Sequence, residues 1–172
     1  MAPDKGAASK DLDREPGLAT DEGQYLTFTV GNEFYGVDIL RVREIKGLTS
    51  VTQVPMTPNY IKGVIKLRGT IIPIVDLRLR FGMPPAEPTP FTVIVILAVQ
   101  DLAMGIIVDS VSDVLMIPRQ ELQWAPTLGG AANMTVTRQI AKVGGRVVFL
   151  LDIERLLSDS DSAAIQAATE GA

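Results

Sequence analysis

The feature that most constrains the fold is a succession of short runs rich in valine and isoleucine, separated by Gly, Pro, Asp or Asn. These runs cover residues 24–30, 33–37, 42–46, 63–68, 70–77, 91–99, 103–108, 111–117 and 146–153. Short β-branched segments between turn residues are typical of antiparallel sandwiches and barrels. The segments between the runs lack the length and period of a crossover helix, so we predict an all-β fold with short helices.

Two local signals refine this prediction. The apolar residues of the first run alternate with threonines, which places them on one face of a strand, and the Gly31-Asn32 pair then predicts a tight hairpin. Pro73 lies inside a run that otherwise has the character of a central strand. Because proline donates no ladder hydrogen bond, we expect a sheet edge or a bulge there.

The chain divides into three parts. Residues 1–23 are polar and lack an apolar period, which predicts a flexible N-terminal tail, whereas residues 24–157 carry the strands of the β domain. Within that domain four prolines between residues 83 and 90 predict a stiff connector between two groups of strands. For residues 158–172 we predict a frayed C-terminal tail.

The C-terminal region has a weak helical pattern. Residues 153–157 and 163–168 are predicted to form short helices, broken by the polar residues 158–162. This pattern predicts a short helix at the end of the β domain, with fraying beyond residue 157.

Cysteine and histidine are both absent from the 172 residues. Thiolate metal sites, disulfides, histidine ligands and Ser/His or Cys/His catalytic pairs are therefore excluded. The glycine pairs at 129–130 and 144–145 lack the spacing of a phosphate-binding loop. We expect a protein that is not an enzyme and has no cofactor and no metal. A carboxylate-dependent enzyme is the remaining catalytic alternative.

The N-terminal residues lack the basic start and apolar stretch of a secretory signal. The longest apolar run, residues 93–99, is far shorter than the roughly 18 residues that span a bilayer. We therefore expect a cytoplasmic protein that does not insert into a membrane.

The formal net charge of −4 is unevenly distributed. Residues 41–80 hold only two acids, Glu44 and Asp76, against the bases Arg41, Arg43, Lys46, Lys62, Lys66, Arg68, Arg78 and Arg80. A positive surface that faces an acidic partner is one interpretation, and a nucleic-acid-binding barrel is another. Nucleic-acid barrels interleave basic residues with stacking aromatics, however, and Tyr60 is the only aromatic residue between Tyr35 and Phe81.

Two segments are well placed to form a docking surface. Residues 38–45 mix apolar residues with acids and bases, and Lys66-Leu67-Arg68-Gly69 ends a predicted strand with an arginine at the turn. A rigid barrel edge that displays Arg68 beside Glu44 would suit a protein partner, although a solvated hairpin with a surface ion pair fits the same residues.

Four longer stretches resemble the CheW family of bacterial chemotaxis coupling proteins. They are QYLTFTVGNEFYGVDILRVREI at 24–45, PNYIKGVIKLRGTIIPIVDLRLRFG at 58–82, VIVILAVQDLAMGIIVDSVSDVL at 93–115 and VVFLLDIERLL at 147–157. The resemblance implies two intertwined five-stranded SH3-like barrels that share a hydrophobic core. It also implies an adaptor, monomeric in isolation, that links methyl-accepting receptors to the regulatory domain of the histidine kinase CheA at membrane-associated arrays.

The resemblance further implies two sets of contact residues. The receptor-binding set is Val42, Glu44, Gly63, Arg68 and Val114, with Glu44 and Arg68 paired across a groove. The kinase-binding set is Val51, Thr92, Val93, Gly105 and Val111. Family members commonly have asparagine where this chain has Lys66, so the turn that follows is expected to carry an added positive charge.

Overall fold

The structure is a computed structural model that describes residues 22–99, 102–124 and 135–170. The flexible tail predicted for residues 1–23 therefore lies almost wholly outside the described residues. Its last two residues do not fit the prediction, because Glu22 and Gly23 begin the first strand and pair with Pro118 and Ile117.

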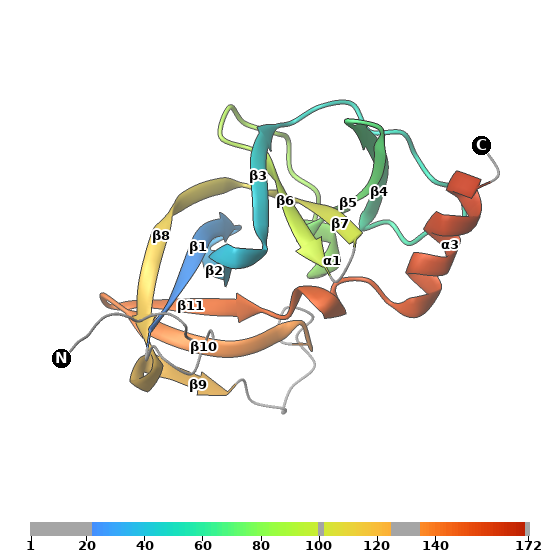
Figure 1. The fold of residues 1–172 in the computed structure, drawn as a ribbon. Helices are drawn as coiled ribbons and strands as arrows, with labels where there is room; N and C mark the ends of the chain where they lie inside the picture. The colour runs from blue at the N-terminus through green and yellow to red at the C-terminus, as the bar shows by residue number, and fades with distance from the viewer. Residues whose placement is uncertain (1–21, 100–101, 125–134, 171–172) are drawn as a thin grey trace.

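The described residues form two β-sheets (Figure 1). Sheet 1 has the spatial order β8 (Ser110–Pro118), β1 (Glu22–Val30), β2 (Glu33–Asp38), β11 (Arg146–Leu151), β10 (Thr137–Val143) and β9 (Leu122–Trp124). Sheet 2 has the order β3 (Val42–Gly47), β6 (Val93–Val99), β7 (Leu102–Val108), β5 (Thr70–Asp76) and β4 (Ile61–Leu67). Short helical segments are η1 (Ile39–Arg41), α1 (Leu77–Arg80), η2 (Arg119–Glu121), η3 (Ile153–Arg155) and α3 (Asp159–Glu170).

The two sheets are intertwined along the chain. Sheet 1 takes β1 and β2, the chain then builds all of sheet 2, and β8 returns to pair with β1. Neighbouring strands are antiparallel except for the β2–β11 and β5–β7 pairs, which are parallel. This confirms the predicted all-β fold of two intertwined units. Sheet 2 has the five strands expected of each barrel, whereas sheet 1 has a sixth, the short strand β9.

The largest hydrophobic cluster is shared by both sheets. Leu26, Phe28 and Tyr35 of sheet 1 pack in one cluster with Leu97 and Ile106 of sheet 2. Because alternate residues of a strand point to opposite faces, the other faces fill a separate interior for each sheet. Strands buried on both faces explain why β6 and β7 are apolar almost without interruption.

Sheet 2 closes on itself through the segment that follows β3. Thr52 and Val64 exchange backbone hydrogen bonds of 2.9 and 2.8 Å, which joins this segment to β4. At Pro73, strand β5 is paired only with β4, because its pairing with β7 begins at Ile74. Proline is tolerated there because no strand on the other side requires its amide. The predicted sheet edge is therefore confined to this part of β5.

Helix α3 begins at Asp159, which corrects the predicted start at residue 163 and the predicted break at 158–162. Ser158 and Asp161 form a capping box: the amide of Asp161 donates to Ser158 Oγ, and the amide of Ser158 donates to Asp161 Oδ2. Ile165 is buried against Val54, Ile61 and Val64, so the helix is docked on β4 rather than frayed. None of the helices in the described ranges is long and apolar enough to cross a membrane.

A partly buried hydrogen bond holds α3 in place, and it makes the free energy of unfolding depend on pH in the alkaline range. The hydroxyl of Tyr60 donates to Asp161 Oδ2 at 2.5 Å. Burial, followed by the hydrogen bond with Asp161, raises the pKa of Tyr60 from 10.0 to about 12. The folded state thus holds this proton more tightly than the unfolded chain, so its contribution is complete below pH 10 and is lost as the pH rises toward 12.

Tyr60→Phe is expected to lower the free energy of unfolding by about 1–2 kcal/mol at neutral pH, because the buried Asp161 loses a donor. Between pH 10 and 11 the stability of the unaltered protein should fall more steeply than that of the variant. Denaturant unfolding at a series of pH values measures both effects. Equal slopes for the two proteins would show that Tyr60 does not carry this pH dependence.

Candidate docking surfaces

The predicted contact residues occupy both the surface and the interior. Glu44 and Arg68 lie on the surface and form an ion pair that joins β3 to the turn between β4 and β5. The pairing that the resemblance implied is therefore present in the structure. Arg68 is mostly exposed, with 72 % of its side chain accessible, so the pair presents a charged surface rather than adding much stability.

The backbone at Arg68 is unusual for an arginine. Leu67 and Thr70 are opposite each other, so Arg68 and Gly69 form a two-residue hairpin turn in which both have positive φ, +50° and +83°. Such turns favour Asn-Gly, because asparagine tolerates the left-handed region better than residues with longer side chains. The turn holds the guanidinium beside Glu44 at the cost of local strain.

The shared core opens to solvent along β8. Val114 is opposite Leu26 in the ladder, so both side chains lie on the face of sheet 1 that borders the shared core. Leu26 is buried, yet Val114 and Met116 are 48 % and 56 % exposed. Val42 of β3 packs against the same core from sheet 2.

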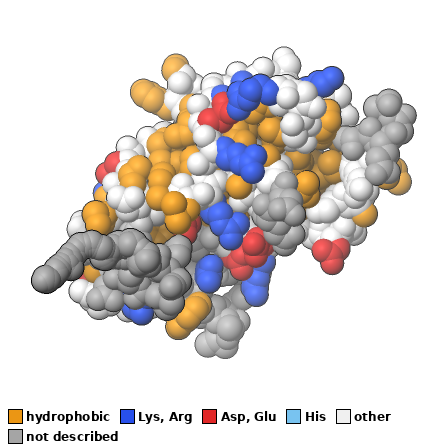
Figure 2. All heavy atoms as spheres, in the orientation of Figure 1, with side chains coloured by type: hydrophobic (Ala, Val, Ile, Leu, Met, Phe, Trp, Pro, Cys, Tyr) orange, Lys and Arg blue, Asp and Glu red, His pale blue; other side chains and the backbone are white. Residues whose placement is uncertain are grey.

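Figure 2 shows hydrophobic side chains gathered over β8 and extending toward β3, with basic side chains nearby. We call the surface formed by Val42, Val114, Met116 and the Glu44–Arg68 pair the inter-sheet groove. It is an apolar strip whose end carries an ion pair, a combination that suits an amphipathic protein segment.

Two predicted contact residues are buried glycines and cannot present a side chain to a partner. A Cβ on Gly63, where φ is +142°, would overlap the carbonyl of Thr52. A Cβ on Gly105 would lie 2.6 Å from Ile74 Cδ1, inside sheet 2. Both positions act through packing: Gly63 lets sheet 2 close, and Gly105 leaves room for the isoleucines around it.

The remaining kinase-set residues are divided between two places. Val51, Thr92 and Val93 are half-buried residues at one end of sheet 2, where Gly47 of β3 pairs with Val93. Val111 lies on β8 opposite Phe28 and packs against the shared core. The structure thus brings three of the five residues toward one end of sheet 2 and places Gly105 and Val111 elsewhere.

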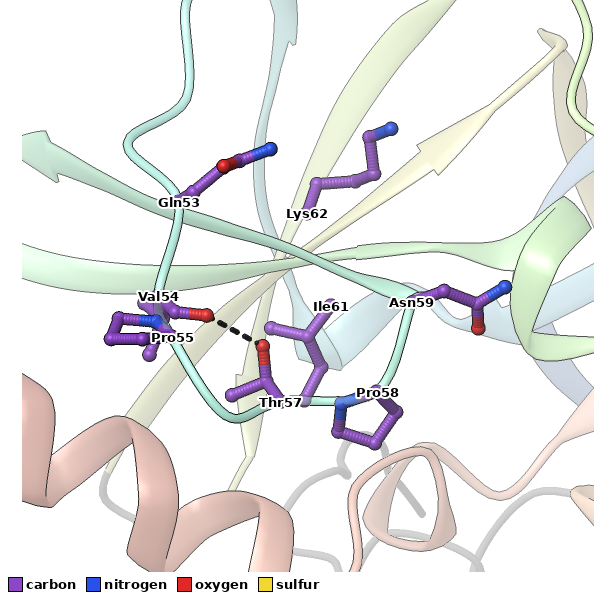
Figure 3. A pocket seen from close by; sticks show the side chains of 8 residues that line it. All are labelled: Gln53, Val54, Pro55, Thr57, Pro58, Asn59, Ile61 and Lys62. Atoms are coloured by element: carbon purple, nitrogen blue, oxygen red, sulfur yellow. Dashed lines mark hydrogen bonds between the residues drawn. The ribbon is translucent and has the colours of Figure 1, made fainter.

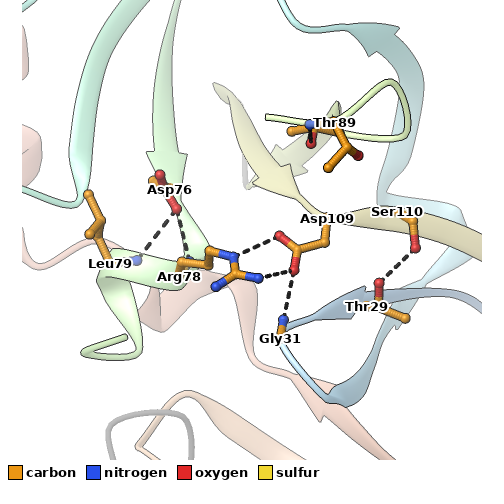
Figure 4. Close-up of polar contacts among 9 residues, drawn as sticks. Thr29, Gly31, Asp76, Arg78, Leu79, Thr89, Asp109 and Ser110 are labelled. Atoms are coloured by element: carbon orange, nitrogen blue, oxygen red, sulfur yellow. Dashed lines mark hydrogen bonds and ion pairs between the residues drawn. The ribbon is translucent and has the colours of Figure 1, made fainter. Parts of the chain in front are cut away.

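A cross-sheet ion pair was not foreseen from the sequence (Figure 4). Arg78 donates to both carboxylate oxygens of Asp109, at 3.0 and 2.7 Å, and the amide of Gly31 donates to Asp109 Oδ2 at 2.8 Å. These hydrogen bonds with Asp109 raise the pKa of Arg78 above its usual value. Asp109 therefore ties the β1–β2 turn of sheet 1 to the α1 helix that follows strand β5 of sheet 2.

The loop before β4 and the first residues of β4 line an open hollow, whose side chains are drawn in Figure 3. Its volume is about 520 Å³. The Thr57 hydroxyl donates to the carbonyl of Val54 across it at 2.8 Å, so the loop is braced by its own residues. Among the described residues, no group of three or more acids is placed to hold a metal ion.

Several bases of the basic segment have partners within the protein. Arg41, Arg68 and Arg78 pair with Glu154, Glu44 and Asp109. Arg80 donates to the carbonyls of Leu156 and Arg155 and lies over the ring of Tyr60. Half of the eight bases are thus engaged within the protein, which weakens the nucleic-acid interpretation.

The comparison with known protein families decides the identity of this domain. The CheW-like domain family matches residues 24–161, which is most of the chain. The chain belongs to the CheW-like family. Chemotaxis protein CheW of Klebsiella aerogenes is 40 % identical over 142 residues, which cover 83 % of this chain and 86 % of that protein. A probable chemotaxis protein CheW of Rhizobium etli is 37 % identical over 147 residues, with coverages of 86 % and 95 %.

The fold agrees with this assignment to the CheW-like family. The crystal structure of the scaffolding protein TtCheW from Thermoanaerobacter tengcongensis superposes with a TM-score of 0.75 at 29 % sequence identity. The match covers 81 % of this chain and 94 % of TtCheW. CheW-like proteins are chemotaxis scaffolds rather than an enzyme family, so the chain is a scaffold of chemotaxis signalling.

Proposed function

We propose that this CheW-like protein couples methyl-accepting chemotaxis receptors to the regulatory domain of the histidine kinase CheA. It performs this role in the cytoplasm, where it is recruited to membrane-associated receptor arrays. The mechanism requires two separate docking surfaces on one rigid body and no reactive centre. The shared core supplies that rigidity, because both sheets contribute to one close-packed cluster.

The receptor-binding surface is the inter-sheet groove. The observation that carries this assignment is the half-exposed pair Val114 and Met116 on the core-facing side of β8. A helical hairpin of a receptor can place apolar side chains on this strip while its polar residues meet the Glu44–Arg68 pair. Gly63 supports the groove indirectly, since it allows sheet 2 to close beneath β4.

The kinase-binding surface lies at the end of sheet 2 that carries Val51, Thr92 and Val93. A partner docked there does not compete with one in the groove, so receptor and kinase are held together by a single molecule. Each contact can be modest, because repeated neighbours in an array raise the effective concentration. Signal transfer then corresponds to a coupling free energy on the order of 1–3 kcal/mol between the two sites.

Arg68→Asn separates the function of the turn from its folding. Asparagine is favoured at this position of the turn, so the variant is expected to be as stable as the unaltered protein or slightly more stable. The variant loses the guanidinium that pairs with Glu44. We expect receptor binding to weaken about 5- to 30-fold, because the contact loses one hydrogen-bonded charge. Sedimentation with receptor-containing membranes measures binding, and thermal unfolding measures stability.

Arg155→Asn is the matched control for this experiment. Arg155 is similarly exposed, at 69 %, and pairs with Asp152, neither of which belongs to the residues that define the inter-sheet groove. The Arg155→Asn variant should leave receptor binding unchanged. If Arg68→Asn binds the receptor normally, the Glu44–Arg68 ion pair is not part of the receptor-binding surface. A salt-dependent shift of duplex or single-stranded nucleic acid by the purified protein would instead favour the nucleic-acid alternative.

A further inference from the structure

An exposed aromatic side chain lies beside the proposed kinase-binding surface. Phe91 is 72 % exposed, although it immediately precedes Thr92 and Val93. Leu48, which follows the Gly47–Val93 pair at the end of β3, is also exposed at 40 %. Large apolar side chains held in solvent next to half-buried ones are typical of protein contact sites.

The turn that carries Phe91 is braced by its own hydrogen bonds. The amide of Thr89 donates to Thr92 Oγ1 at 2.9 Å, and the amide of Phe91 donates to Thr89 Oγ1 at 3.1 Å. The amide of Thr92 also donates to the carbonyl of Thr89 at 3.1 Å. Prolines on the N-terminal side restrict the backbone further. An aromatic side chain on such a turn loses little conformational entropy on binding.

A hollow of about 440 Å³ adjoins this turn. Its apolar lining comes from Leu48, Val51, Ala86, Pro88 and Ile107, with Thr89 and Thr92 at the edge. Arg78 and Asp109, whose ion pair is drawn in Figure 4, also line it. The hollow is therefore lined by both apolar and polar side chains.

The charges of Asp76, Arg78 and Asp109 in the hollow are already satisfied within the protein. Arg78 is bound through two hydrogen bonds to Asp109, and Asp76 accepts from the amides of Arg78 and Leu79. An anionic ligand would have to displace Asp109 from the guanidinium. Lys62 and Glu87, two exposed lining residues, carry opposite charges, so the hollow has no net attraction for nucleic acid or an anionic membrane.

We infer that Phe91 and the adjoining hollow form the anchor of the kinase-binding surface. Phe91 enters an apolar socket on the kinase, and an apolar side chain of the kinase fills the hollow. Phe91 then becomes buried at the centre of the contact with the kinase. Lys62 and Glu87 lie at the polar rim of that contact. The inference rests on the proposed coupling function and names the residues that determine its affinity for the kinase.

The test compares Phe91→Ala with Leu102→Ala in the full-length protein. Leu102 is 71 % exposed, which matches Phe91, but it pairs with Val99 at the opposite end of the β6–β7 hairpin. Binding to the intact kinase is measured by titration calorimetry. Phe91→Ala should weaken binding on the order of 30-fold, and Leu102→Ala should change it less than about 2-fold.

Ala86→Phe, which fills the hollow from an exposed loop, provides a second arm and should also weaken kinase binding. Both loop variants should bind receptor membranes normally, because the inter-sheet groove is untouched. Equal kinase affinity of Phe91→Ala and the unaltered protein overturns the inference and leaves the coupling function intact. No kinase binding by the unaltered protein overturns both, and a loss of self-association in Phe91→Ala would identify a second copy as the occupant.

Discussion

Gly63→Val is expected to lower the free energy of unfolding by about 3 kcal/mol or more. The backbone at Gly63 has φ of +142°, a region that residues with a Cβ rarely adopt. The added side chain would also overlap the carbonyl of Thr52, the group that accepts the amide of Val64 when sheet 2 closes. Denaturant unfolding measures the loss.

Gly47→Val is the matched control, because Gly47 ends β3 and has open space where a Cβ would be. Its free energy of unfolding should change by no more than about 0.5 kcal/mol. A defect in receptor binding by Gly63→Val should therefore follow the loss of folded protein. Full stability combined with lost receptor binding would instead show that Gly63 contacts the receptor directly.

Arg78→Met is expected to cost about 2–4 kcal/mol of stability, because it leaves Asp109 charged and partly buried between the two sheets. The side chains of Arg78 and Asp109 are only 25 % and 31 % exposed, so solvent screens this pair less than the Glu44–Arg68 pair, whose arginine is 72 % exposed. Chemical denaturation of the single variant gives this cost.

Adding Asp109→Asn to Arg78→Met should recover about 1–2 kcal/mol, since the amide oxygen can still accept from Gly31 while the isolated charge is removed. Arg155→Met is the control, because its partner pair with Asp152 lies on the surface and should cost less than about 1 kcal/mol. Additive effects of the Arg78 and Asp109 substitutions would show that the two side chains do not stabilise each other.

The sequence predicted the strands that carry a clear apolar pattern. The alternation in β1, the two-residue turn at Gly31 and the apolar runs of β6 and β7 all mark strands that the structure contains. Strand β10 escaped prediction because Arg138, Gln139 and Lys142 interrupt its apolar residues. Strand β9 is only three residues long and is stabilised by its pairing with β10.

One local signal in the sequence marks the start of the C-terminal helix. Ser158 and Asp161 have the spacing of a capping box, within the run predicted to break the helix. Its docking was not accessible from sequence, because Ile165 and Asp161 meet partners about one hundred residues earlier in the chain.

The sequence by itself determined the strands with a clear apolar pattern and the turns between them, the absence of histidine and cysteine chemistry, and the motifs that mark a CheW-like protein. Only the tertiary structure decided that Gly63 and Gly105 are packing positions, that Asp109 binds Arg78 and Gly31, and that Val114 borders an open end of the shared core. The sequence pattern of a strand shows which of its faces is apolar, because the residues of each face alternate along the chain. Which apolar side chains are covered depends on how two interlocked sheets meet, and that is set by contacts between distant residues.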